Sequence, residues 1–173
     1  MGIVPRWADA YGESHINARS ETVAEKPAFA DAYERRRCLV PADGFYEWVD
    51  SGDGKQPFRV AFDDDRLFEM GVSGSDGPRK RNRLDSAILL VGPDDEPQTL
   101  ETLTILTTEP NDIVERLHSR MAVILAPDEE DAWLDGDDVS FDPASSRSLH
   151  SYPVSTAVNN PANDDPQPIE AVR

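Results

Sequence analysis

The apolar residues of this 173-residue chain occur only in short runs, and this pattern limits the possible fold more than any other feature. The longest runs lie near residues 87–91 and 122–125, well short of the roughly 18 consecutive apolar residues that span a bilayer. Between polar stretches lie short segments typical of strands, namely residues 45–49, 57–62, 66–72, 85–91 and 102–107. The length suits one compact domain with a single core. We therefore predict an α+β fold with a curved, mostly antiparallel, barrel-like β-sheet.

Helical patterns are fewer than strand patterns. Residues 25–36 place apolar side chains at the i, i+3 and i+4 spacings of one helical face. Residues 127–134 open with a proline and acidic residues, which the first turn of a helix prefers. The end of the chain contains three prolines and little apolar content. We predict a few short helices, one domain over residues 1–160 and a flexible tail over residues 161–173.

The cysteine and histidine content limits the cofactor chemistry. Cys38 is the only cysteine, so an intramolecular disulfide and a zinc site of several thiolates are both excluded. The three histidines are His15, His118 and His150, and the carboxylates are scattered along the chain rather than clustered with them. We therefore predict no metal and no other cofactor. The start of the chain lacks a secretory signal pattern, so we expect a cytoplasmic monomer without a membrane partner.

The net charge of -17 has two interpretations. An acidic protein in dilute buffer repels the phosphates of nucleic acids. A protein adapted to molar salt carries the same charge without this effect, because the Debye length is about 3 Å at 1 M salt. The cations favour the second interpretation, since there are fourteen arginines and only three lysines. In a halophilic protein, a DNA-binding site is compatible with this charge.

Glu47 occupies an unusual position in a segment with strand character. Within this strand Phe45, Glu47 and Val49 share one face, while Tyr46 and Trp48 share the other. A carboxylate on an apolar face is costly unless it is paired or its pKa is raised. A raised pKa suits a general acid or base. The alternatives are a carboxylate at the surface or on an edge strand, or one in a structural ion pair.

Two further pairs of polar residues stand two positions apart. His118 and Arg120 would project to the same face if their segment is extended, and such a pair suits phosphate contact or proton transfer beside an anion. A structural histidine and a solvated arginine are the ordinary alternative. Asn17 and Arg19 form a similar pair, for which a turn residue and a surface salt bridge are the alternative.

Four segments together resemble one known family. They are Asn17-Ala18-Arg19 with Glu21-Thr22, the segment Arg37-Cys38-Leu39 with Pro41 to Trp48, Thr107-Thr108 with His118-Ser119-Arg120-Met121, and Tyr152-Pro153-Val154-Ser155. Their sequence, order and spacing resemble the SOS-response-associated peptidase family of abasic-site-processing proteins. The resemblance covers roughly residues 2–160, and a chance match to all four segments is not credible.

The resemblance implies a covalent reaction with single-stranded DNA that contains abasic sites. Family members begin Met-Cys-Gly-Arg, and removal of Met exposes a cysteine. Its amine and thiol condense with the aldehyde of the ring-opened sugar to form a thiazolidine crosslink. The printed chain begins Met-Gly-Ile-Val-Pro-Arg-Trp, where the family usually reads Trp-Gly-Leu-Ile-Pro-x-Trp. We therefore expect the nucleophile to be missing from it, through a late start codon, a truncated gene or a degenerate paralogue.

The resemblance also implies roles for particular residues. Asn17 would orient the amino terminus or the sugar, and Glu47 would assist proton transfer during Schiff-base formation and self-processing. His118 would act as acid or base in opening the sugar ring and in reversing the crosslink. The residues implied in DNA binding are Arg19 and Arg120 at phosphates, Trp7 and Trp48 near displaced bases, and Thr107.

Two other functions remain open. The first is a module that binds single-stranded or lesion-containing DNA without covalent capture. The second is a peptidase acting on other proteins, which has the weakest support because it needs an internal nucleophile beside a base. Cys38 does not supply the crosslinking chemistry, since an internal cysteine has no α-amine.

Overall fold

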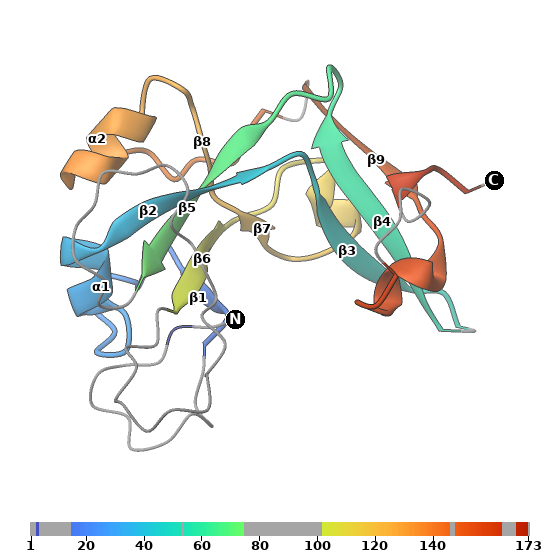
Figure 1. Cartoon of the computed structure of the whole chain (residues 1–173), viewed down its shortest axis with the longest axis horizontal. Coiled ribbons are helices and arrows are strands. Elements are labelled where there is room, and N and C mark those ends of the chain that lie inside the picture. The colour runs from blue at the N-terminus through green and yellow to red at the C-terminus, as the bar shows by residue number, and fades with distance from the viewer. Residues whose placement is uncertain are drawn as a thin grey trace, which may run out of the picture. The chain divides into compact units, whose positions relative to one another are not determined.

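The computed structural model describes residues 3, 15–52, 54–74, 102–145, 148–163 and 169–172 (Figure 1). The chain divides into two compact units, which are considered separately. The first unit comprises Met1–Val40, Glu69–Thr108 and Ala122–Asp142, and the second comprises Pro41–Phe68, Glu109–Met121 and Pro143–Arg173.

The larger sheet has four main strands in the order β1-β6-β5-β2. Their bounds are β1 Asn17–Arg19, β6 Leu103–Thr108, β5 Phe68–Gly74 and β2 Arg37–Ala42, and the two-residue strands β7 Met121–Ala122 and β8 Ile124–Leu125 complete the sheet. Strand β1 runs parallel to β6, whereas β5 is antiparallel to both β6 and β8. A three-residue strand such as β1 has few hydrogen bonds of its own, so its place depends on this distant partner.

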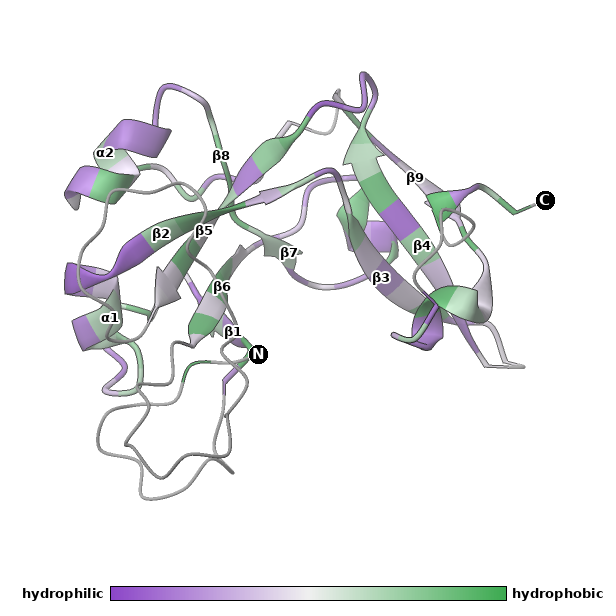
Figure 2. Ribbon diagram, in the orientation of Figure 1, coloured by the Kyte–Doolittle hydropathy of each residue, from purple (hydrophilic) through white to green (hydrophobic). Residues whose placement is uncertain are grey.

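The core of the first unit is centred on Trp133, which is fully buried. This residue lies in α2 (Glu130–Asp135), a one-and-a-half-turn helix that ends where Gly136 adopts a left-handed conformation with φ of 91°. The indole Nε1 donates a hydrogen bond of 3.0 Å to the carbonyl of Cys38. The buried residues around Trp133 are Ala18, Val23, Leu106, Val123 and Leu125. Helix α2 carries both hydrophobic and hydrophilic residues (Figure 2).

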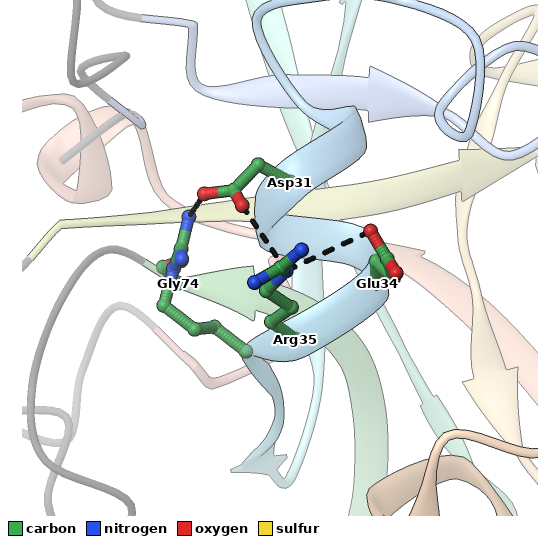
Figure 3. A network of polar contacts seen from close by, with 5 residues as sticks. Asp31, Glu34, Arg35 and Gly74 are labelled. Atoms are coloured by element: carbon green, nitrogen blue, oxygen red, sulfur yellow. Dashed lines mark hydrogen bonds and ion pairs between the residues drawn. The ribbon is translucent and has the colours of Figure 1, made fainter.

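Helix α1 (Ala30–Arg35) is joined to the end of β5 by a small polar network (Figure 3). Arg36 donates from Nε to the carbonyl of Gly74 at 2.9 Å and pairs through Nη2 with Asp31 at 2.6 Å. The backbone N–H of Gly74 returns a hydrogen bond of 2.8 Å to the carbonyl of Arg36. Arg35 adds ion pairs to Asp31 and Glu34, but such exposed pairs contribute little stability. The backbone contacts therefore fix this junction.

The second unit is built on a three-stranded antiparallel sheet in the order β3-β4-β9, whose strands lie side by side in Figure 1. The bounds are β3 Phe45–Asp50, β4 Lys55–Phe62 and β9 Leu149–Pro153. The described residues of this unit also form the 3₁₀ helices η1 Val114–Arg116 and η3 Thr156–Asn159. The register places Glu47 opposite Phe58, and Phe58 opposite Pro153. At the tail, Val172 N–H donates to the carbonyl of Pro153 at 2.9 Å.

A buried arginine holds the turn that precedes β3. Arg59 is 6% exposed and donates from Nη2 to the carbonyl of Asp43 and from Nη1 to the hydroxyl of Tyr152, each at 2.9 Å. The turn passes so close to β4 that a Cβ atom on Gly44 would lie 2.9 Å from both Arg59 Nε and the carbonyl oxygen of Val60. Only glycine fits here without displacing the backbone of β4.

We predict that Gly44→Ala lowers the free energy of unfolding by about 1–3 kcal/mol, because overpacking forces neighbouring atoms to move. The measurement is the urea midpoint at constant salt. Gly71→Ala is the matched control, since its added Cβ would meet nothing closer than Val123 Cγ1 at 3.5 Å, an ordinary contact. Equal midpoints for Gly44→Ala and the parent would show that the turn has more room than the structure gives it.

The predicted fold class is confirmed, with mostly antiparallel strands and few short helices. Strands occur at four of the five predicted segments, and the fifth, residues 85–91, lies outside the described residues. The helix predicted over residues 25–36 is shorter than expected, because Pro27 lacks an N–H and disfavours a helical conformation in the residue before it. Within the described part of the chain, no helix is long and apolar enough to cross a membrane.

Candidate functional site

Glu47 and His118 lie close together in the second unit. Strand β3 directs Glu47 away from Tyr46 and Trp48, as the alternation predicted, and its side chain is only 20% exposed. The Nδ1 atom of His118 is 4.0 Å from Glu47 Oε1. Burial raises the pKa of Glu47 above its ordinary value, while the nearby charge of His118 opposes this rise. The pair therefore places a carboxyl group with a raised pKa beside an imidazole, and such a pair can transfer protons.

The backbone of Arg120 holds the His118 ring. Nδ1 lies 3.1 Å from the amide nitrogen of Arg120 and 3.0 Å from its carbonyl oxygen. A ring with its proton on Nδ1 can donate to the carbonyl whether or not Nε2 is also protonated, and a ring without that proton can accept from the N–H. The His118 side chain is 51% exposed, and Nδ1 is occupied by these contacts. Nε2 is thus the ring nitrogen left to exchange a proton with a substrate.

The segment from His118 to Arg120 is a bend rather than a strand. The shared face that an extended segment would give these two side chains is therefore not formed, because the backbone turns back to meet the imidazole. The chain enters this bend from η1, where the amide groups of Leu117 and His118 both donate to the carbonyl of Val114 at 2.8 Å. Val114 is fully buried, so the loop is attached to the core of the second unit just before His118.

Glu47→Gln should raise the melting temperature at pH 7 and have little effect below pH 4.5, the ordinary pKa of a glutamate. Because the folded pKa is raised, stability is highest when Glu47 is protonated and is lost as the pH rises through the folded pKa. Glutamine imitates the protonated form at every pH. Glu25→Gln, at an exposed position, is the control. A gain that is equal at both pH values would contradict a burial effect on Glu47.

Three other residues with predicted roles at the DNA or the sugar, Asn17, Arg19 and Thr107, lie in the first unit. Asn17 and Arg19 are exposed on β1, whereas Ala18 between them is 2% exposed and faces the core. Arg19 stands beside Thr107 in the parallel register of β1 and β6, and the Thr107 hydroxyl donates to the carbonyl of Ala18 at 3.3 Å. Asn17, Arg19 and Thr107 therefore share one face of the larger sheet.

Of the two tryptophans predicted to lie near displaced bases, Trp48 is among the described residues. Trp48 is 40% exposed on the face of β3 opposite to Glu47, with the ring of Tyr46 beside it. Its Nε1 donates a hydrogen bond of 2.7 Å to Asn159 Oδ1 at the end of η3. Sequence reasoning missed Asn159, because nothing in the local pattern connects residues 111 positions apart. Trp7 lies outside the described residues.

Comparison with known proteins identifies the family of this chain. The sequence profile of the SOS response associated peptidase (SRAP) family matches residues 1–161. The chain belongs to this family. The match includes both the Glu47–His118 pair and the Asn17–Arg19 strand.

Relatives of this SRAP-family chain are found in bacteria and vertebrates. The abasic site processing protein YoaM of Bacillus subtilis is 35% identical over 98% of this chain and 73% of its own length. The abasic site processing protein HMCES of Gallus gallus is 34% identical over 98% of this chain and 56% of its own length. A crystal structure of a Bacteroides thetaiotaomicron protein has a TM-score of 0.79 at 24% identity, covering 99% of this chain and 75% of that one. That structural likeness shows the shared fold alone.

Cys38 of this SRAP-family chain lies on β2, where burial raises its thiol pKa to about 11. At pH 8 only about one thiol in a thousand would then be ionised. We expect iodoacetamide to label Cys38 far more slowly in the folded protein than in urea, and Cys38→Ala to leave DNA binding unchanged. Equal labelling rates would contradict an inert thiol.

No group of three or more potential metal ligands occurs in the described ranges.

Proposed function

We propose that this protein processes abasic sites in single-stranded DNA, with Glu47 and His118 transferring protons. The observation that carries the proposal is the pair itself, a carboxyl group with a raised pKa 4.0 Å from an imidazole. The names of the relatives support it, since YoaM and HMCES are both called abasic site processing proteins.

The proposed chemistry divides proton transfer between the two side chains. An amine adds to the aldehyde of the ring-opened abasic sugar to give a carbinolamine, which loses water to form an imine. A thiol of the same residue then adds to the imine carbon, and its proton passes to nitrogen to complete the thiazolidine. Protonated Glu47 donates to the departing hydroxyl, while His118 Nε2 exchanges the proton that opens or closes the sugar ring. In the proposed self-processing peptidase step, which removes the amino-terminal Met, Glu47 also acts as a proton donor.

The other predicted site residues would contact the DNA strand. In the proposal Arg19 and Arg120 contact phosphates that flank the lesion, and Asn17 orients the reacting terminus or sugar. Trp48 and Thr107 contribute further contacts to the strand. The net charge of -17 opposes phosphate binding in dilute buffer. In molar salt this long-range repulsion is screened and only short-range contacts act, so the affinity for DNA should be measurable there.

The test is a binding measurement with three labelled oligonucleotides in molar potassium chloride. They are single-stranded DNA with a tetrahydrofuran abasic analogue, the same strand without a lesion, and the duplex that carries the analogue. The proposal requires the tightest binding to the first strand. Equal affinity for all three would overturn the assignment of abasic single-stranded DNA as substrate.

A non-covalent DNA-binding module is the second candidate. The observation that favours it is that Cys38 lies within strand β2, where burial raises its thiol pKa to about 11. Incubation with authentic abasic DNA separates the two functions. The protein is tested in an extended form that begins Met-Cys-Gly-Arg, as family members do, so that removal of Met leaves a form that starts with cysteine. Covalent capture would be supported by a heat-stable adduct that is lost when this cysteine is replaced by serine. Binding without any adduct in that form would support the module.

A further inference from the structure

We infer that Asn111 is a positioning residue that fixes the loop of residues 111–121 and so places His118 and Arg120. The inference rests on the proposed function for the roles of those two residues. It concerns only the second unit, to which the whole loop belongs.

The side chain of Asn111 uses both ends of its amide. Its Oδ1 accepts hydrogen bonds from the backbone N–H groups of Ile113 at 3.1 Å and Val114 at 3.0 Å. They are the amides of the residue before η1 and of its first residue, and a short helix of this kind offers such amides no partner of its own. Its Nδ2 donates to the carbonyl of Ala144 at 2.8 Å. One side chain therefore caps η1 and ties it to a segment 33 residues later in the chain.

The backbone of Asn111 closes the base of the same loop. Its N–H points to the sulfur of Met121 at 3.4 Å, and its carbonyl accepts from Glu115 N–H at 2.9 Å. Met121 is 1% exposed, so the contact at the far end of the loop is itself held in the core. Asn111, the first residue of the loop, thus contacts both its first helical turn and its last residue.

His118 depends on this arrangement through a short chain of contacts. The amide of His118 donates to the carbonyl of Val114, whose own N–H is capped by Asn111. The imidazole is then held by the backbone of Arg120, one residue before Met121. Within the described residues, His118 is held by the carbonyl of Val114 and by the backbone of Arg120, and both of these are connected to Asn111. An error of about 1 Å in such a group can cost a factor of 100 in rate.

Aspartate separates the capping contacts from the donor contact. Asn111→Asp keeps an oxygen that can cap Ile113 and Val114 but loses the donor to Ala144, whereas Asn111→Ala loses all three hydrogen bonds. Asn163→Ala is the matched control, because that side chain donates a single hydrogen bond, to Ala157, at an exposed position.

The first measurement is amide hydrogen exchange of residues 1–173. We expect the His118 amide to exchange at least 10 times faster in Asn111→Ala than in the parent, and Asn111→Asp and Asn163→Ala to stay close to the parent. If the His118 amide is protected equally in Asn111→Ala and the parent, the inference is overturned, whatever the function of the protein.

The second measurement is a double-mutant cycle on the rate of adduct formation, in the form of the protein that starts with cysteine. We expect Asn111→Ala to slow the reaction about 10- to 100-fold in the parent and to have little further effect in His118→Ala, because it acts through that residue. Additive losses would indicate a general loss of structure and overturn the positioning role. An unaltered rate in His118→Ala would instead refute the proposed function of His118, while the exchange result would still decide whether Asn111 orders the loop.

Discussion

Replacing His118 by alanine should slow formation and reversal of the proposed abasic-site crosslink by about 10²- to 10⁴-fold, the usual contribution of a general acid or base. The expectation follows from the position of the ring, with Nδ1 held by Arg120 and 4.0 Å from Glu47. The measurement is single-turnover adduct formation in molar salt, followed by release into excess unlabelled abasic DNA. The form of the protein that starts with cysteine is used for both steps.

His150→Ala is the control for this prediction. His150 also pairs with a carboxylate, at 3.1 Å from Asp63 Oδ1, and stacks on the ring of Tyr152. It therefore reports on the loss of a surface imidazole and its ion pair without removing His118. If His118→Ala retained parental rates in both directions, His118 would be a structural residue. If both histidine variants lost activity equally, the loss would reflect stability.

Trp133→Ala should destabilise the protein by about 3–5 kcal/mol, the second large effect. The side chain is fully buried, packs edge-on against Tyr33 at 5.8 Å and donates to the carbonyl of Cys38. Alanine leaves a large cavity and removes the hydrogen bond to the Cys38 carbonyl, and both effects act in the same direction. The measurement is the free energy of unfolding in urea at fixed molar salt.

Trp48→Ala is the matched control, because that indole is 40% exposed and its loss opens little cavity. We expect it to cost clearly less than Trp133→Ala. An equal loss for the two tryptophans would mean that the first unit's core is not centred on Trp133. Because a loss of several kcal/mol approaches the whole stability of many domains, Trp133→Phe provides a variant that keeps most of the ring packing.

The sequence allowed the immediate surroundings of Glu47 to be predicted but not its partner. Period-two alternation alone assigned Glu47 to one face of the strand and Trp48 to the other, and both placements are confirmed. The partner, His118, is 71 positions later, a separation over which no local pattern operates. Only the family resemblance connected these two residues before the fold was known.

Other differences have local physical causes. The parallel strand β1 consists of three residues paired with β6, about 88 positions later in the chain, so its pairing could not be read from propensity. Asn111 had a recognisable signal, since asparagine is a preferred residue at the start of a helix, but a 3₁₀ turn of three residues has too weak a pattern to reveal one. Trp7 lies in a part of the chain that the structure does not describe, and its role stays a prediction.

The contact between His118 and the backbone of Arg120 has a consequence for energetics. With its proton on Nδ1, the ring can keep donating to the carbonyl of Arg120 at 3.0 Å while Nε2 gains or loses a proton, so the imidazole need not rotate when its charge changes. A group whose surroundings are already arranged for both charge states lowers the reorganisation part of a barrier in either direction. In the proposed reaction the same ring can therefore serve attachment and release alike, altering how quickly the lesion is captured or freed while leaving the equilibrium between the two states unchanged.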